Sequence, residues 1–381
     1  MGHVGPSSAF RDDDGIPFLM GKNVGNGYLK LHDLERVTPA FHQRERKSQL
    51  AAGDVVVVRI GNSGQAALVP ASLGEANCSG LVVLKQPTKV DASYLVHFLN
   101  SPEGRKRSLA EAKGSTRQTL NTKVIATAEI PLPPLAEQRR IAEVLDRAET
   151  LLTKRRAALA QLDILTQSIF LDMFGDIERN ARGMPRMPIA DVVLGHDGVK
   201  AGPFGSSLKK SDYATSGYRV YGQEQVIAGR FDVGNYYVGE RKYQQLKSCA
   251  VHEGDVLLSL VGSFGKALAI PSGVERGIIN PRLLKIRPDP IKVRAEYLVA
   301  FMGQSSTQRV LARMAHGGTM PILNVGLIKR LDILVPPLDV QDEFVGRLAA
   351  VNFLVRLAED GVTQLDTLLA SLQHRAFRGE L

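Results

Sequence analysis

The sequence predicts an α+β fold in which two mixed α/β domains are separated by two long antiparallel helices, paired as in a coiled coil. Three observations predict it. The second half of the 381-residue chain repeats the first, each copy begins with a glycine-rich part that contains short apolar runs, and each copy ends in a long segment with an apolar stripe. A chain of this length also exceeds one ordinary core, so more than one domain is expected.

The repeat keeps a nearly constant register. Gly53-Asp54-Val55 recurs as Gly254-Asp255-Val256, an offset of 201 (254 minus 53). Farther along, Tyr94-Leu95-Val96 recurs as Tyr297-Leu298-Val299, an offset of 203 (297 minus 94). Chance similarity does not hold one register over that distance. The two halves should therefore form two copies of one structure, related by an approximate two-fold axis.

Each glycine-rich part is expected to be mixed α and β. Short runs of apolar and β-branched residues bounded by turn residues are typical of buried strands, and a longer helical segment follows them in each copy. The expected strands are residues 54–60, 81–84, 255–261 and 283–286, and the expected helices are residues 92–111 and 293–314.

A proline pair opens each tail, which suits the first turn of a helix, where a missing backbone N–H costs no hydrogen bond. No glycine or proline then occurs from 135 to 174. These roughly 40 positions would make a helix about 60 Å long. The second tail has a similar stripe, with one weak point at Gly361. Each stripe needs a partner, and the other copy, packed antiparallel, is the nearest candidate. The alternative is that both helices belong to the core of a larger helical domain.

The composition favours a polyanionic partner. Lys and Arg number 48 against 39 Asp and Glu, which gives a net charge of +9 and a pI near 9.5. A solvated basic surface without such a partner is the alternative. Cys78 and Cys249 have no second thiol nearby, which excludes a disulfide framework and a zinc cluster and indicates a reducing compartment. With no apolar run of roughly 20 residues and no signal peptide, we expect a soluble cytoplasmic protein.

Two matching signatures point to a family. Residues 130–138 read Ile-Pro-Leu-Pro-Pro-Leu-Ala-Glu-Gln and residues 333–341 read Ile-Leu-Val-Pro-Pro-Leu-Asp-Val-Gln, each after a Gly-x-Thr and Leu-Asn stretch and before a long helix. In a two-copy arrangement, these signatures resemble the DNA-specificity subunit of type I restriction-modification systems, over nearly the whole chain. The resemblance implies a first target recognition domain at 1–130, a central spacer helix at 131–178, a second target recognition domain at 179–332 and a C-terminal spacer helix at 333–381.

The resemblance also implies a non-catalytic protein that binds double-stranded DNA at a bipartite target with a fixed gap. Its partners would be modification (methyltransferase) subunits, which dock on the spacer helices, and restriction (translocase and nuclease) subunits. S-adenosylmethionine, ATP and Mg²⁺ would belong to those partners, with no cofactor in this chain. The residues implied in docking are Pro134, Leu135, Glu137, Gln138, Pro337, Leu338 and Gln341.

Two departures from the family pattern affect these expectations. Residues 184–200 have no counterpart before Met1, so the first domain is expected to lack an N-terminal element of roughly 25 residues. Val340 stands where the first copy has Glu137. The alternative function is therefore a non-catalytic assembly scaffold that uses the paired helices, with one or both recognition domains inactive.

Several enzyme-like motifs are incomplete. Residues 262–267 imitate a phosphate-binding loop but lack its first glycine and end in alanine where Ser or Thr would bind magnesium. Glu111 and Lys113 have no Pro-Asp pair before them, as a nuclease metal site would require, and Asn280-Pro281 only begins like an adenine methyltransferase motif. His252-Glu253 lacks the second histidine of a zinc peptidase. We predict no catalytic and no metal site, which leaves a stand-alone endonuclease as a third, weaker hypothesis.

Polar and basic side chains on loops are the expected DNA contacts, because Lys and Arg bind phosphates while amide and guanidinium groups pair with base edges. For any single residue, a solvated surface position is the alternative. In the first domain the candidates are Lys22, Asn23, Lys30, His42, Gln43, Arg44, Arg46, Ser115, Thr116 and Arg117. In the second domain they are Ser206, Ser207, Lys209, Lys210, Arg219, Gln223, Gln225, Arg241, Lys242, Gln244, Thr319 and Asn324.

Overall fold

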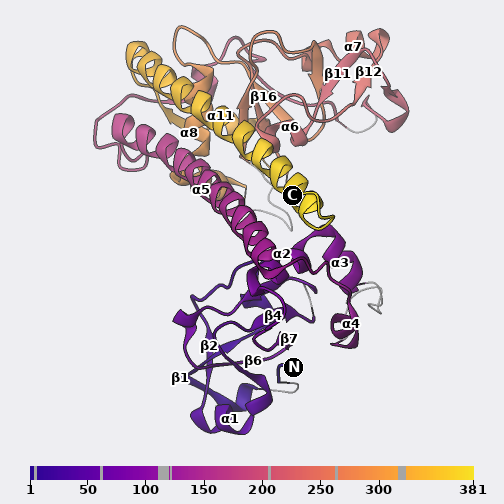
Figure 1. Cartoon of the computed structure of the whole chain (residues 1–381). Coiled ribbons are helices and arrows are strands. Elements are labelled where there is room, and N and C mark those ends of the chain that lie inside the picture. The colour runs from indigo at the N-terminus through magenta and orange to yellow at the C-terminus, as the bar shows by residue number, and fades with distance from the viewer. Residues whose placement is uncertain are drawn as a thin grey trace. The chain divides into compact units, whose positions relative to one another are not determined.

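The computed structural model describes residues 1–3, 7–60, 63–109, 120, 122–204, 207–261, 265–315 and 323–381. The chain divides into two compact units: unit 1 comprises Met1–Ala157 and Ala358–Leu381, and unit 2 comprises Ala158–Leu357. Each unit contains one glycine-rich domain and about half of each long helix (Figure 1). The four-part division drawn from the sequence, which keeps each helix whole, stays a prediction.

Unit 1 contains two sheets, with strand orders β2-β1-β6-β3 and β5-β4-β7. All four residues of β4 are buried, as the sequence predicts for this β-branched run. The strands are β1 (Arg11–Leu19), β2 (Glu35–Val37), β3 (Gln49–Leu50), β4 (Val55–Val58), β5 (Ala66–Leu68), β6 (Ala76–Cys78) and β7 (Leu81–Leu84).

Unit 2 contains sheets with the orders β10-β12-β11-β15 and β14-β13-β16-β9, together with the pair β17-β8. The strands are β8 (Arg186–Pro188), β9 (Val199–Ala201), β10 (Tyr213–Ala214), β11 (Tyr218–Tyr221), β12 (Tyr237–Val238), β13 (Val256–Ser259), β14 (Ala267–Ala269), β15 (Gly277–Ile279), β16 (Leu283–Ile286) and β17 (Asp332–Leu334).

The predicted helices at 92–111 and 293–314 were wrong in one respect: each is two helices. In unit 1, Pro102 disfavours a helical conformation at Ser101, whose ψ of 158° breaks the helix. In unit 2 the break falls at Gln304, with ψ of 138°. The shorter helices are α1 (Pro39–Arg44), α2 (Ala92–Asn100), α3 (Pro102–Leu109) and α4 (Thr122–Thr127) in unit 1, and α6 (Gln223–Ala228), α7 (Glu240–Gln245), α8 (Ala295–Gly303), α9 (Ser305–Met314) and α10 (Val325–Lys329) in unit 2.

Strand pairing confirms the internal repeat. In unit 1, β1 pairs parallel with β6, with Leu19 opposite Cys78. In unit 2, β11 pairs parallel with β15, with Tyr221 opposite Ile279. The corresponding offsets are 202 (221 minus 19) and 201 (279 minus 78). The predicted α+β class with two mixed domains is therefore confirmed.

The Gly-Asp motif has the same local role in both copies. Asp54 and Asp255 are buried, and each accepts a hydrogen bond from the backbone N–H three residues earlier, at 2.9 Å from Ala51 N and 2.9 Å from His252 N. A buried carboxylate held by local N–H donors fixes the turn that begins β4 or β13. The motif recurs because it positions a strand.

The two copies differ at one sheet edge. In unit 2, β9 pairs antiparallel with β16 as a fourth strand, whereas the equivalent sheet has three strands in the described part of unit 1. Gly2 N donates to Leu81 O at 2.8 Å, as Gly202 N donates to Leu283 O at 2.9 Å, so these two glycines occupy equivalent positions. Residues 199–201 form β9 immediately before the second of them.

The long helices are α5 (Leu135–Phe174) and α11 (Leu338–Ala376), and the bounds of α5 are those the sequence predicts. Gly361 does not interrupt α11. Within unit 1 the helices pack antiparallel, because Arg140 bonds to Leu381 O at 2.7 Å while Arg156 bonds to Asp366 at 2.9 Å, so residue numbers rise along one helix and fall along the other.

One helix among the described residues, Leu135–Phe174, is long and apolar enough to cross a membrane by length and composition alone. Core helices of soluble proteins pass the same test, which makes it weak evidence. Phe170 and Phe174, near its end, are fully buried in unit 2 and contact Tyr297 and Phe344, with ring centroids 5.0 to 5.8 Å apart. These apolar side chains therefore serve a protein core.

Candidate nucleic-acid interface

Unit 2 contains a hollow of about 920 Å³ that gathers polar, cationic and aromatic side chains from separate segments. Its walls come from the segment before β10, from β11 and the start of α6, and from the turn between β15 and β16. Tyr213 and Tyr236 meet edge to face in it, with ring centroids 5.4 Å apart. The lining residues are Lys210, Tyr213, Val220, Gln223, Glu224, Gly234, Tyr236, Asn280, Pro281 and Arg282.

Gln223 is the predicted base-reading residue that the structure places in this hollow. It begins α6, and its amide nitrogen donates to Ser259 Oγ and to Val261 O, both at 2.5 Å. These bonds fix the side chain and use its donors. The amide oxygen is the atom left to accept a hydrogen bond from a base.

Asn280 and Arg282 join Gln223 in the hollow, although the sequence reading treated Asn280-Pro281 only as an incomplete methyltransferase motif. Asn280 N donates to Tyr221 O at 2.8 Å, and its Oδ1 accepts from Arg282 N at 2.9 Å. These bonds hold the turn rigidly, and Arg282 is exposed above it. Comparison of the two copies could have indicated this turn, because its residues differ between them: the equivalent positions of unit 1 carry Ser79 and Gly80 (280 and 281 minus 201).

The cations beside the hollow differ in availability. Lys209 and Lys210 are exposed, whereas Lys242 pairs with Asp212 at 3.1 Å and donates to Ser207 O at 3.2 Å. The backbone N–H of Lys209 and then the Lys242 ammonium hold the pKa of Asp212 below its ordinary value. Lys242 is therefore largely neutralised by its partner, and the two preceding lysines carry the free positive charge.

Helix α7 lies outside the lining of the hollow. Arg241 and Gln244 are exposed on it, and Gln244 donates to Glu240 at 2.6 Å. Tyr243 is buried and stacks on Tyr218, with ring centroids 3.8 Å apart. Helix α7 therefore carries a buried, stacked tyrosine with exposed polar side chains beside it.

In unit 1 the predicted residues lie on several segments. Lys22 pairs with Glu35 at 2.6 Å, and Arg44 lies 4.6 Å above the ring of Phe10. His42 is half-buried on α1. The exposed residues of the predicted set are Lys22, Lys30, Gln43, Arg44 and Arg46.

Residues 2–161 match the family model described as the type I restriction modification DNA specificity domain. Over 400 residues the chain is 22% identical to the StySPI specificity subunit of Salmonella potsdam, covering 98% of this chain and 84% of that protein. Over 394 residues it is 21% identical to the EcoKI specificity subunit of Escherichia coli K12, covering 97% and 83%. The chain is thus similar to type I specificity subunits over nearly its whole length. The expected resemblance is confirmed.

Solved structures agree on the fold. A chain of a type I R-M system, from work on its complex assembly and conformational transition, superposes with a TM-score of 0.57 at 16% identity, covering 98% of this chain and 95% of that one. The S subunit of a type I system from M. genitalium superposes with a TM-score of 0.58 at 14% identity, covering 99% and 92%. At these identities the likeness shows the fold alone.

Three predicted DNA contacts were wrong because their side chains are buried. Arg219 is 6% exposed and bonds to Glu275 at 2.5 Å and to the carbonyls of residues 233 and 234. Gln225 is fully buried, accepting from Gly222 N at 2.7 Å. Asn23 is 4% exposed and accepts from Met20 N at 2.9 Å. Their bonds stabilise the loops from inside.

The docking prediction needs a similar correction. Gln138 and Gln341 are buried, and each fastens the start of a long helix to its own domain. Gln138 accepts from Asp91 N at 2.8 Å and donates to Pro133 O at 2.7 Å. Gln341 accepts from Arg294 N at 2.8 Å and donates to Pro336 O at 2.8 Å and to Lys292 O at 3.0 Å.

The rest of the proline motif is more accessible. Pro134, Leu135 and Pro337 are exposed and Leu338 is half-buried. Glu137 pairs with Arg140 at 2.7 Å, whereas Val340, its replacement in the second copy, packs against the core of unit 2. The departure at Val340 therefore exchanges a helix-surface ion pair for an apolar contact.

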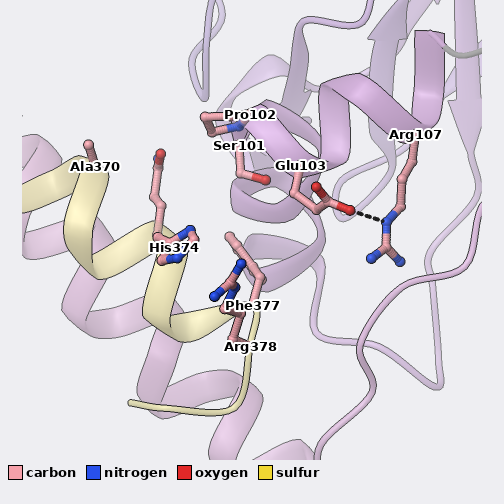
Figure 2. A pocket seen from close by; sticks show the side chains of 9 residues that line it. Ser101, Pro102, Glu103, Arg107, Ala370, His374, Phe377 and Arg378 are labelled. Atoms are coloured by element: carbon pink, nitrogen blue, oxygen red, sulfur yellow. Dashed lines mark hydrogen bonds and ion pairs between the residues drawn. The ribbon is translucent and has the colours of Figure 1, made fainter.

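A second hollow, of about 400 Å³, lies within unit 1 (Figure 2). Figure 2 shows Glu103 paired with Arg107 on one side and His374 and Arg378, from the last turn of α11 and beyond, on the other. Gln373 lines it at the position where unit 2 has the buried Phe170 (373 minus 203). A polar side chain thus lines this hollow where the equivalent position of unit 2 carries a buried aromatic ring.

The remaining predicted residues include one cap and several positions outside the described ranges. Asn324 is the N-cap of α10, and its side chain accepts from Leu327 N at 2.9 Å. Ser115, Thr116, Arg117, Ser206 and Thr319 lie outside the described residues. Within the described ranges, no group of three or more His, Cys, Asp or Glu side chains is placed to hold a metal ion.

Proposed function

We propose that this specificity subunit recognises a bipartite sequence in double-stranded DNA and that the hollow of unit 2 reads one half of it. The observation that supports this best is the convergence of Gln223, Asn280 and Arg282 on one rigid surface beside the exposed Lys210. The relatives are named as specificity subunits of restriction enzymes, and a specificity subunit selects a target without catalysing a reaction on it.

The side chains match the chemistry of base edges. Arginine donates two hydrogen bonds to guanine, asparagine pairs with adenine through its amide N–H and its oxygen, and a free glutamine oxygen accepts from the amino group of a base, whereas lysine binds phosphates. Asn280 and Gln223 are fixed by hydrogen bonds to protein groups, so little side-chain entropy is lost when they bind. We assign base reading to these two residues and Arg282, and phosphate binding to Lys209 and Lys210.

Unit 1 would bind the second half-site. Its exposed cations, Lys30, Arg44 and Arg46, are the retained candidates. Because the copies share a backbone plan but carry different side chains at equivalent surface positions, the half-sites should differ in sequence. A fixed, unread gap between them follows from a spacer of two helices, each about 60 Å long.

Assembly with further subunits completes the proposal. Modification subunits that bind S-adenosylmethionine, and restriction subunits that use ATP and Mg²⁺, would supply the chemistry in the cytoplasm. Large apolar side chains exposed on the long helices of unit 2, including Ile164, Phe353 and Leu357, favour such docking. A scaffold without sequence recognition is the competing function.

The decisive experiment maps methylated positions produced by the complex of this chain with its modification subunit. We expect one bipartite sequence. Arg282→Ala should relax selection at one or two positions of a single half-site, costing about 1–3 kcal/mol of discrimination. Arg313→Ala, which removes an exposed arginine paired with Glu178 in the same unit, is the matched control. Methylation without any selected sequence would instead support the scaffold.

A further inference from the structure

Phe204 stands out on the surface of unit 2, two residues after Gly202, which lies against the turn at Asn280. Its side chain is 75% exposed, in the segment between β9 and Lys209. Isolated apolar side chains are common on protein surfaces and need no explanation by themselves. The backbone that carries this one, and the charges around it, are what give it significance.

The segment that leads to Phe204 is rigid and lies against the turn at Asn280. A Cβ on Gly202 would fall 1.9 Å from Asn280 O, so only glycine permits this approach. Gly202 N also donates to Leu283 O at 2.9 Å, and Pro203 fixes the next φ angle. Phe204 O in turn accepts from Ser207 N at 3.1 Å. The backbone that carries the ring is therefore held against the turn.

The neighbours of Phe204 along the chain and across the turn are those expected beside a DNA duplex. Lys209 and Lys210 follow it and are exposed, and Arg282 belongs to the turn that Gly202 touches. If these cations bind backbone phosphates, the DNA lies against this surface and the ring faces its grooves. Apolar side chains in such positions can insert between base pairs. A membrane or an apolar protein surface would not account for the base-reading groups in the adjoining hollow.

We propose that Phe204 is a wedge that inserts between two base pairs in or next to the half-site read by unit 2, unstacking them and bending the DNA. The inference rests on the proposed function of that unit. A wedge adds selectivity without hydrogen bonds, because pyrimidine–purine steps unstack more easily than others. The recognised sequence should therefore contain a flexible base-pair step at one fixed position.

The test uses the complex with the modification subunit and target duplexes that carry 2-aminopurine, a base whose fluorescence rises when it is unstacked. The probe is placed in turn at each position except the base that becomes methylated. We expect one position near the unit 2 half-site to brighten with the unaltered chain, to stay dark with Phe204→Ala and to brighten partly with Phe204→Leu. Binding by Phe204→Ala should weaken by about fivefold or more.

Ile291→Ala is the matched control, since Ile291 is 74% exposed in the same unit but follows β16, in a different segment from the one that Gly202 brings against Asn280. It should leave both the fluorescence and the affinity unchanged. An unaltered signal in Phe204→Ala, with sequence-specific binding retained, overturns the wedge and leaves the proposed function standing. Absence of sequence-specific binding by the unaltered complex overturns the proposed function, and the wedge with it.

Discussion

The two units retain the contacts that join each domain to its long helix, whereas many of the side chains around those contacts differ. Tyr94 donates to Pro131 O at 3.0 Å in unit 1, and Tyr297 donates to Leu334 O at 2.9 Å in unit 2. Gln138 and Gln341 make equivalent clamps. Buried polar groups must keep their partners, so these residues cannot vary one at a time. Surface side chains carry no such constraint.

At two buried or partly buried positions, a polar group in unit 1 replaces an apolar group in unit 2. His97 is buried between helices α2 and α5 at the position of Ala300 (97 plus 203), and Gln373 stands at the position of Phe170. The comparison teaches that one backbone plan is maintained by a few internal bonds while the core chemistry around them diverges. Substitutions at these positions test that view.

The largest effect is expected from the clamp. Gln341→Ala leaves one N–H donor and two carbonyl acceptors without partners, and should lower the free energy of unfolding by roughly 3–5 kcal/mol. Gln138→Ala breaks two hydrogen bonds and should cost somewhat less. Urea denaturation followed by circular dichroism measures both. Gln364→Ala, on an exposed face of α11, should change nothing, and equal stability of all three variants would refute the clamp.

A pH-dependent effect of similar or smaller size is expected in unit 1 alone. Burial by itself would lower the pKa of His97, but hydrogen bonds to Asp146 at 2.7 Å and Glu149 at 3.5 Å outweigh it and raise the pKa to about 9. Because this exceeds the ordinary value of 6.5, the cation stabilises the folded state. The contribution, about 3 kcal/mol, is fully present below pH 6.5 and is lost as the pH rises through 9.

Denaturation of the unaltered chain and of His97→Ala at pH 6.5, 8 and 9.5 would reveal this contribution. The difference in unfolding free energy between them should shrink as the pH rises. Ser93→Ala, which removes a weaker hydrogen bond to Asp146 at 3.2 Å, is a control that should show little pH dependence. A constant difference across the range would mean that His97 is neutral when folded.

The smallest effect is expected from making unit 1 more like unit 2. Gln373→Phe places an aromatic ring in the hollow of about 400 Å³ and should raise the free energy of unfolding by about 1 kcal/mol, seen as a higher melting temperature. Gln373→Ala enlarges the hollow and should not be stabilising. A loss of stability with phenylalanine would show that the hollow is needed for packing or hydration as it stands.

Much of the fold was predictable because its signals are local. The run from Leu135 to Phe174 contains no residue that breaks a helix, and the observed helix has those bounds. The buried β-branched run at β4 was equally clear. The break at Ser101 also has a local signal, because Pro102 disfavours a helical conformation at the residue before it. The prediction of one helix over 92–111 did not take this restriction into account.

The candidate site was less predictable. Polar residues on loops were the only available signal, and that signal does not distinguish Gln223, which faces the hollow, from Gln225, which is buried two positions later. Asn280 and Arg282 were missed because they come from a turn distant in sequence. Contacts between segments brought them to Gln223.

By itself, the sequence determined that this protein is a tandem duplication with an α+β plan, a basic charge and two long helices, because periodicity, turn residues and repeat register are all properties of the chain alone. Only the tertiary structure decided which polar side chains reach the surface. Pairing of β11 with β15 places Arg219 opposite Gly277. A Cβ on Gly277 would lie 2.1 Å from the Arg219 carbonyl oxygen, so this close pairing requires glycine. Such register is set by long-range pairing, and it buried an arginine that local reasoning had assigned to DNA.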